Sequence, residues 1–118
     1  MTSGRPERVR LALRQIDETL AHGRLREAEA LARRLVADSP LAAEAQFILA
    51  ITIQSQGRFD QAEPYFARAV TLDGRNVGYL LNYGLCLLSM GRVPEAAAQY
   101  GKARSVAPSN VEAIWRNG

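Results

Sequence analysis

The sequence is poor in the residues that usually carry catalytic, metal-binding and disulfide chemistry. Its 118 residues include one cysteine, Cys86, and one histidine, His22. A single cysteine cannot form an internal disulfide, and a lone histidine has no partner at catalytic or ligand spacing. The glycines stand singly, so no glycine-rich phosphate-binding loop is formed. The sequence therefore predicts a protein that is not an enzyme and that holds no metal or cofactor.

Long apolar runs are missing as well. Runs such as residues 77–81 and 85–88 are far short of the roughly 20 residues that span a bilayer. The first ten residues contain no apolar core of a secretory signal. From these absences and the single cysteine we expect a cytoplasmic protein with no membrane insertion.

Positive charge is in slight excess but is not concentrated. The net charge is +3, and all of the 15 basic residues except Lys102 are arginines. Residues 1–40 contain eight arginines and also six acidic residues. Because a phosphate-binding surface needs a continuous basic stripe, this distribution predicts a solvated surface of mixed charge and no nucleic-acid partner. A nucleic-acid adaptor is the weaker hypothesis, and salt-dependent binding to DNA or RNA would test it.

An internal repeat organises the chain. Gly23, Gly57 and Gly91 are equally spaced, and each is followed by an arginine, an apolar residue and, farther on, an alanine. We call the distance from one of these glycines to the next the period. The matching positions are Arg24, Arg58 and Arg92; Leu25, Phe59 and Val93; and Ala28, Ala62 and Ala96. A coincidence at so many positions indicates three copies of one structural unit.

Each copy predicts two antiparallel helices. Apolar residues recur at helical spacing on both sides of each glycine, and the glycine is expected to adopt the positive φ of a helix end. The small alanines would let the two helices approach closely. Pro94 falls at a helix start, Pro64 is expected in or near a first turn, and Pro40 and Pro108 end helices. Since one pair cannot bury its apolar face alone, the pairs are expected to stack in a line.

This helix–turn–helix unit resembles the tetratricopeptide repeat, whose length of roughly 34 residues it shares. With the three glycines at the family's turn position, the copies span residues 9–42, 43–76 and 77–110. The third copy matches the family's preferences at Gly84, Gly91, Ala96, Tyr100, Ala103 and Pro108. The first copy matches least well, as terminal repeats often do. The resemblance implies an all-α fold, an α-solenoid in which helix–turn–helix hairpins form a superhelical stack.

The two ends of the chain lie outside these repeats. Residues 1–8 are expected to form a flexible leader or the start of the first helix. Residues 111–118 are expected to form a cap or a truncated fourth repeat, because Ile114 falls one period after Leu80. Such an unfinished repeat would leave residues 96–107 uncovered on one side, which predicts self-association into a homo-oligomer.

The resemblance also implies where partners bind. In this family the first helices of successive repeats line a concave groove. The positions that correspond here are Leu13, Asp17, Leu20, Phe47, Ile51, Gln54, Leu81, Asn82, Leu85, Leu88 and Trp115. Most are apolar, and an exposed apolar stripe of this size usually marks an interaction site. We expect Phe47 and Leu81 to face the groove, and Leu85 and Leu88 to be partly buried in the core.

The groove composition indicates the kind of partner. Members of the family that grip a C-terminal carboxylate use Lys, Asn and Arg at set positions, and here those positions hold Leu13, Asp17, Ile48, Gly78 and Asn82. If the same positions are counted from the second repeat, only Asn82 and Arg116 match the residue types that grip a carboxylate. A partner helix or an extended apolar peptide is therefore favoured. The sequence predicts a protein–protein interaction module with a scaffold or adaptor role. The alternative is the N-terminal docking region of a larger bacterial enzyme such as a transferase, which the residues following 118 would decide.

Overall fold

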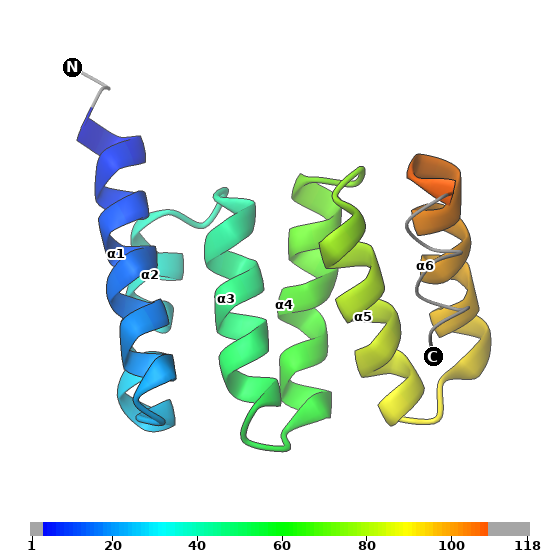
Figure 1. Ribbon diagram of the computed structural model, residues 1–118, viewed down its shortest axis with the longest axis horizontal. Coiled ribbons are helices and arrows are strands. Elements are labelled where there is room, and N and C mark those ends of the chain that lie inside the picture. Colours follow the sequence, from blue (N-terminus) through cyan, green and yellow to red (C-terminus); the bar gives the residue numbers. More distant parts are fainter. Residues whose placement is uncertain (1–3, 109–118) are drawn as a thin grey trace.

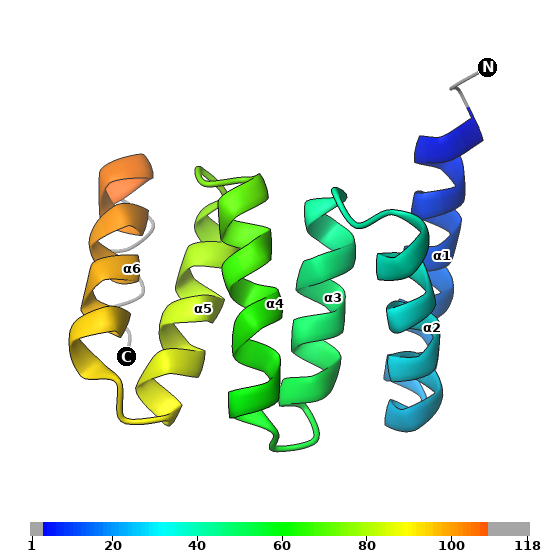
Figure 2. The ribbon, with the colours of Figure 1, turned by 180° about the vertical axis from the view of Figure 1, so that it is seen from behind.

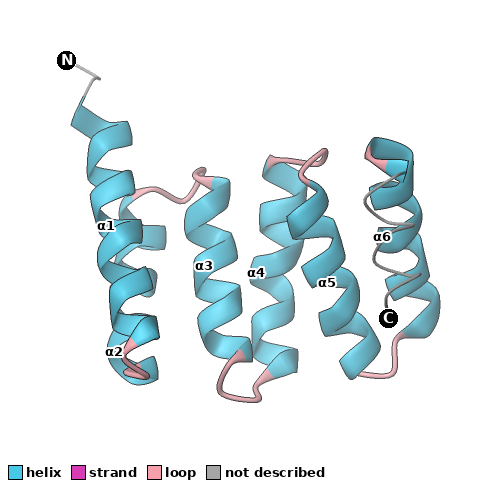
Figure 3. Cartoon of the chain, in the orientation of Figure 1, coloured by secondary structure: helices cyan, strands magenta, loops and turns pink. Residues whose placement is uncertain are grey.

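The glycine spacing sets the helix boundaries. The computed structural model describes residues 4–108, with side chains described from Pro6 onward. Within this range the chain forms α1 (Gly4–Ala21), α2 (Leu25–Asp38), α3 (Ala43–Gln54), α4 (Phe59–Leu72), α5 (Val77–Ser89) and α6 (Val93–Val106). Short turns join the helices, and no strand occurs in the part of the chain that is described (Figure 3). The starts of α2, α4 and α6 are separated by one period each. Helix α1 begins at Gly4, so residues 4–8 belong to it.

The three turn glycines have the backbone conformation that the sequence predicts. Gly23, Gly57 and Gly91 have φ angles of 73°, 79° and 76°, and this prediction is confirmed. An added Cβ would meet no atom within 4 Å at any of the three. Glycine is therefore favoured there because of the left-handed backbone and not because of crowding.

The hairpins stand in a row. Figure 1 shows the helices running alternately up and down from α1 at one end to α6 at the other. Helix α1 lies in front of α2 in Figure 1 and behind it in Figure 2, so the first and second helices of this hairpin form two layers. Each helix packs on the next along the chain, and α1 also contacts α3. The arrangement is an all-α solenoid, as predicted.

The core runs along the row between the two layers. Ala28, Ala62 and Ala96 are fully or almost fully buried, as expected for small residues at the contact between paired helices. Phe66 of α4 is the largest fully buried side chain among the described residues. Pro64 is the sixth residue of α4 and therefore lies in its second turn, yet the helix continues unbroken to Leu72.

Candidate interaction groove

The predicted groove residues are carried by the first helix of each hairpin. Helix α1 carries Leu13, Asp17 and Leu20; α3 carries Phe47, Ile51 and Gln54; and α5 carries Leu81, Asn82, Leu85 and Leu88. Helices α1 and α3 are in contact, so the first two sets lie on neighbouring helices. Trp115 lies outside the described residues, as do Ile114 and the predicted cap or fourth repeat.

Leu85 and Leu88 are exposed, so the expectation that they are partly core is wrong. Leu85 is 53% exposed and Leu88 is 44% exposed. The buried face of α5 is formed by residues such as Leu80 and Leu87, which are 0% and 1% exposed. Leu81, Leu85 and Leu88 follow the i, i+4, i+7 spacing of a single helix face, on which Leu85 and Leu88 point away from that core. Leu81 is half-buried against Leu80, so the exposed apolar surface is greatest toward the end of α5.

Phe47 is a packing residue as well as a groove position. It is half-buried, and its ring stacks on Tyr79 with centroids 4.4 Å apart. The same ring meets Phe66 edge-on at 5.8 Å, and Phe66 in turn stacks on Tyr83 at 6.4 Å. These rings join α3, α4 and α5, and each such pair adds about 0.5–1.5 kcal/mol beyond the area that it buries. A substitution at Phe47 would therefore disturb the stack of hairpins together with the groove.

Charge is distributed unevenly over the three first helices. Helix α5 contains no charged residue, α3 contains only Glu44, and the others lie on α1. Among the polar groove positions, Asp17 is exposed, whereas the Asn82 side-chain amide donates to the Gly78 carbonyl at 2.7 Å. The groove is thus neutral and apolar over α5 and charged over α1.

A cavity of about 780 Å³ opens at the charged end. We call it the N-terminal cavity. It lies between the first turns of α1 and the loop joining α2 to α3, and its apolar lining is Pro6, Val9, Leu13, Pro40, Leu41 and Ala42. Arg10, Ser39 and Glu44 complete the lining. Leu41 is 81% exposed. Arg10, Leu13 and Glu44 correspond to groove positions of the family, whereas the remaining lining residues were not predicted, since a cavity formed by a loop and a helix end leaves no periodic signal.

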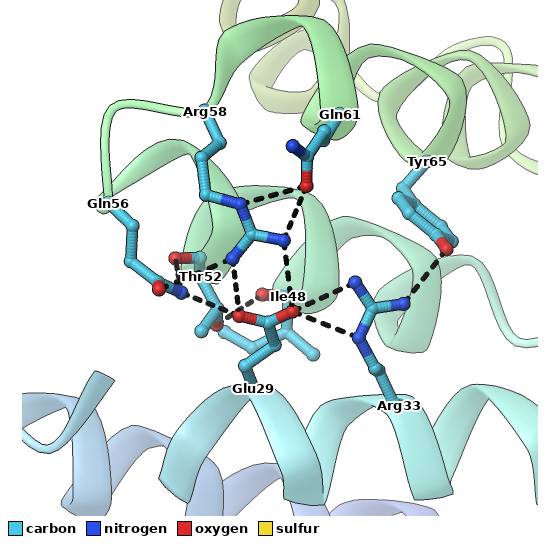
Figure 4. Close-up of polar contacts among 8 residues, drawn as sticks. All are labelled: Glu29, Arg33, Ile48, Thr52, Gln56, Arg58, Gln61 and Tyr65. Carbon is cyan, nitrogen blue, oxygen red and sulfur yellow. Dashed lines mark hydrogen bonds and ion pairs between the residues drawn. The ribbon is translucent and has the colours of Figure 1, made fainter. Parts of the chain in front are cut away.

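A polar cluster links the first hairpin to the second (Figure 4). Glu29 of α2 accepts hydrogen bonds at Oε1 from Arg58 Nη1 and Gln56 Nε2, both at 2.8 Å. Its Oε2 accepts from Arg33 Nε at 2.9 Å. Arg33 also donates from Nη1 to the Tyr65 hydroxyl at 3.2 Å. The hydrogen bond from Arg58, followed by those from the other donors, lowers the pKa of Glu29 to about 2 against the opposing effect of burial.

The same link recurs one repeat later in a weaker form. Glu63 and Arg92 lie one period after Glu29 and Arg58, and their charged atoms are 3.7 Å apart. Glu63 Oε2 also accepts a hydrogen bond from the Tyr83 hydroxyl at 2.6 Å. Ala97 occupies the corresponding position of the third copy. The recurrence of glutamate and arginine at one period was the signal that would have revealed these links in the sequence.

The two residues with the greatest potential for chemistry occupy structural positions. Cys86 is fully buried, and its thiol donates to the Phe59 carbonyl at 3.4 Å. Burial raises the pKa of this thiol to about 11. His22 is exposed at the end of α1, with Nδ1 2.8 Å from the Glu18 carbonyl oxygen. Throughout residues 4–108 no three potential metal ligands are grouped together. In the same range, no helix has both the length and the apolar character needed to cross a membrane.

Solved structures with the same arrangement of helices include two bacterial proteins. The Yersinia enterocolitica type III secretion chaperone SycD, in complex with a peptide of the translocator YopD, superposes with a TM-score of 0.82 at 14% identity, covering 94% of this chain and 92% of that one. MamA from Desulfovibrio magneticus superposes with a TM-score of 0.79 at 19% identity, over 92% of this chain and 61% of that chain. At these identities the likeness concerns the fold.

A third structure and a family match complete the comparison. The second tetratricopeptide domain of Spaghetti (RPAP3), bound to the HSP90 peptide SRMEEVD, superposes with a TM-score of 0.77 at 16% identity, covering 83% of this chain and 91% of that one. No curated protein matches the sequence. The family described as anaphase-promoting complex, cyclosome, subunit 3 matches residues 21–103. The chain therefore belongs to this family, and it is a tetratricopeptide-repeat protein.

Proposed function

We propose that this chain is a protein–protein interaction module that holds a partner helix or an extended apolar segment against α3 and α5. The observation that carries the proposal is the exposed pair Leu85 and Leu88, at 53% and 44%, on one face of a helix without charged residues. A solvent-exposed apolar face of this kind is typical of a binding groove. Covering the exposed parts of the two leucines would contribute roughly 1 kcal/mol each.

The charge distribution supports an apolar partner over an acidic tail. Neither α3 nor α5 offers a cation to a carboxylate, and Asn82 already donates to its own helix. Two structural neighbours hold peptides, SycD one from YopD and RPAP3 one from HSP90. Their shared fold supports peptide binding here, while the residues of this groove favour a less acidic ligand than the HSP90 peptide SRMEEVD.

Selection of peptides on the immobilised full chain tests this proposal. A random peptide library displayed on phage should yield sequences rich in apolar residues. Affinities of the selected peptides, measured by fluorescence polarisation, should fall at least about tenfold in Leu85→Glu and in Leu88→Glu, since the apolar contact is replaced by a desolvated charge. Circular dichroism should show unchanged helix content because both positions are exposed.

Leu11→Glu is the matched control. Leu11 is 62% exposed on α1, and it occupies the position one period before Ala45, outside the predicted groove set. Its substitution should leave peptide affinity unchanged. Equal binding by the wild type and both α5 variants would refute the proposed groove.

A further inference from the structure

The two junctions between hairpins are filled differently. Between the second and third hairpins, the Tyr79 ring stacks on Phe47 with centroids 4.4 Å apart. One period earlier, between the first and second hairpins, the equivalent residues are Ala45 and Leu13. Ala45 presents only a methyl group and is itself fully buried, while Leu13 lines the N-terminal cavity of about 780 Å³. The stacked rings of one junction therefore have no counterpart at the other.

The N-terminal cavity has the properties of a side-chain pocket. Its volume falls within the range of roughly 300–1,000 Å³ that is typical of ligand sites. Its walls are mostly apolar, and Leu41, 81% exposed, would lose unfavourable contact with water if a group were bound. Apolar lining with a few polar groups favours a ligand that is largely apolar with one polar end.

The charged lining residues indicate what that polar end is. Arg10 and Glu44 both line the cavity, and among the described residues neither forms an ion pair. A carboxylate accepts strongly from a phenol hydroxyl, and the chain already contains such a pair in Tyr83 and Glu63 at 2.6 Å. The Arg10 guanidinium can donate to a peptide carbonyl beside the ring.

We propose that the N-terminal cavity is an anchor site for a tyrosine side chain of a partner polypeptide. The ring packs against Leu13 and the apolar loop, and the hydroxyl donates to the Glu44 carboxylate. The proposal rests on the proposed function, because it places this tyrosine in the same polypeptide that crosses the groove toward α5. It adds a second point of attachment, which fixes the direction in which that polypeptide lies.

The cavity can be probed without any polypeptide. We expect p-cresol, the tyrosine side-chain analogue, to shift the NMR signals of the Val9, Leu13 and Leu41 methyl groups saturably in the labelled full chain. The methyl groups of Leu85 and Leu88 should not shift. Toluene, which lacks the hydroxyl, should bind at least several-fold more weakly in the wild type but equally well in Glu44→Leu. Glu44→Gln, which keeps an acceptor, should retain part of the preference.

Variants of the lining supply a second test. Ala42→Phe places a ring in the cavity from within and should abolish p-cresol binding. Leu41→Ser should weaken it, whereas Leu11→Ser, at a position of similar exposure outside the cavity, should not. Thermal unfolding of each variant verifies that it is folded. Absence of saturable shifts in the wild type, or shifts confined to Leu85 and Leu88, would overturn the proposed site.

Selected peptides then test the anchoring role separately. Peptides that bind the wild type should contain a tyrosine, and replacing it with alanine should weaken binding to the wild type at least about tenfold but have little effect with Ala42→Phe. If the losses of affinity caused by the peptide's tyrosine-to-alanine change and by Ala42→Phe simply add, the anchoring role is overturned. If p-cresol binds but Leu85→Glu leaves peptide affinity unchanged, the groove proposal fails while the pocket stands. If peptides bind through Leu85 but p-cresol does not bind, the groove proposal stands and the tyrosine site is overturned.

Discussion

Removing the charge of Glu29 should destabilise the junction between the first two hairpins. The substitution Glu29→Gln keeps the size of the side chain but weakens its bonds to Arg33 and Arg58. Depression of the Glu29 pKa from 4.5 to about 2 sets an upper limit of about 3 kcal/mol. The Arg33 and Arg58 side chains are 45% and 33% exposed, so solvent screening reduces the expected loss to about 1–2 kcal/mol.

The pH dependence gives this prediction its sign. The folded-state pKa of Glu29 lies below its unfolded value, so the stabilisation is present above about pH 4.5 and is lost as the pH falls toward 2. Near neutral pH, Glu29→Gln should lower Tm by about 4–10 °C for a chain of this size. The difference between wild type and variant should shrink across the acidic window.

Thermal unfolding followed by far-ultraviolet circular dichroism measures both effects. Glu27→Gln is the control, because Glu27 is on the same helix but exposed and 3.9 Å from Arg24. It should lower the free energy of unfolding by less than about 0.5 kcal/mol. The reasoning is refuted if the two variants have the same Tm, or if the effect of Glu29→Gln persists unchanged down to pH 2.

The remaining predictions concern three glycines and the buried thiol. In urea titrations, Gly57→Ala should lower the free energy of unfolding by about 1–2 kcal/mol because the φ of Gly57, 79°, is left-handed. Gly101→Ala should instead raise the free energy of unfolding by about 0.5–1 kcal/mol, because Gly101 is helical and no atom lies near the new Cβ. A Cβ at Gly84 would lie 2.9 Å from the Tyr100 ring, so Gly84→Ala should cost about 1–3 kcal/mol. That cost should vanish in a Tyr100→Ala background, and purely additive costs would contradict the clash. Cys86, with its pKa near 11 instead of 9, should react with a thiol reagent near pH 8 at least about 100-fold more slowly in the native protein than in urea, and equal rates would show that the thiol is accessible.

The fold was predictable because its determinants are local and repeated. A positive φ at Gly57 depends on the turn alone, and the burial of Ala62 depends on its distance from that turn. Both residues recur in the other two repeats at the same spacing, which strengthens the prediction. Sequence reasoning therefore located the turns and the close-packed alanines without knowledge of distant contacts.

The candidate site was only partly predictable, for reasons visible in α5. Helix α5 carries apolar residues on nearly all of its faces, so composition alone cannot distinguish its buried face from its exposed face. Leu85, a predicted groove position, was consequently expected to be partly buried in the core, although it is 53% exposed. The cluster around Glu29 depends on long side chains that reach between hairpins, and the N-terminal cavity depends on a loop and the extra turn of α1. Only a three-dimensional arrangement places such groups together.

The two junctions between hairpins are held by different kinds of polar and aromatic contact. The second junction is filled by the rings of Phe47, Tyr79, Phe66 and Tyr83. The first junction combines an apolar core, which includes Leu35, Ala45 and Leu49, with the hydrogen bonds around Glu29. The ends of the solenoid should therefore respond to different conditions: salt and acid weaken the charged link at the first junction, whereas the stacked rings of the second are insensitive to both.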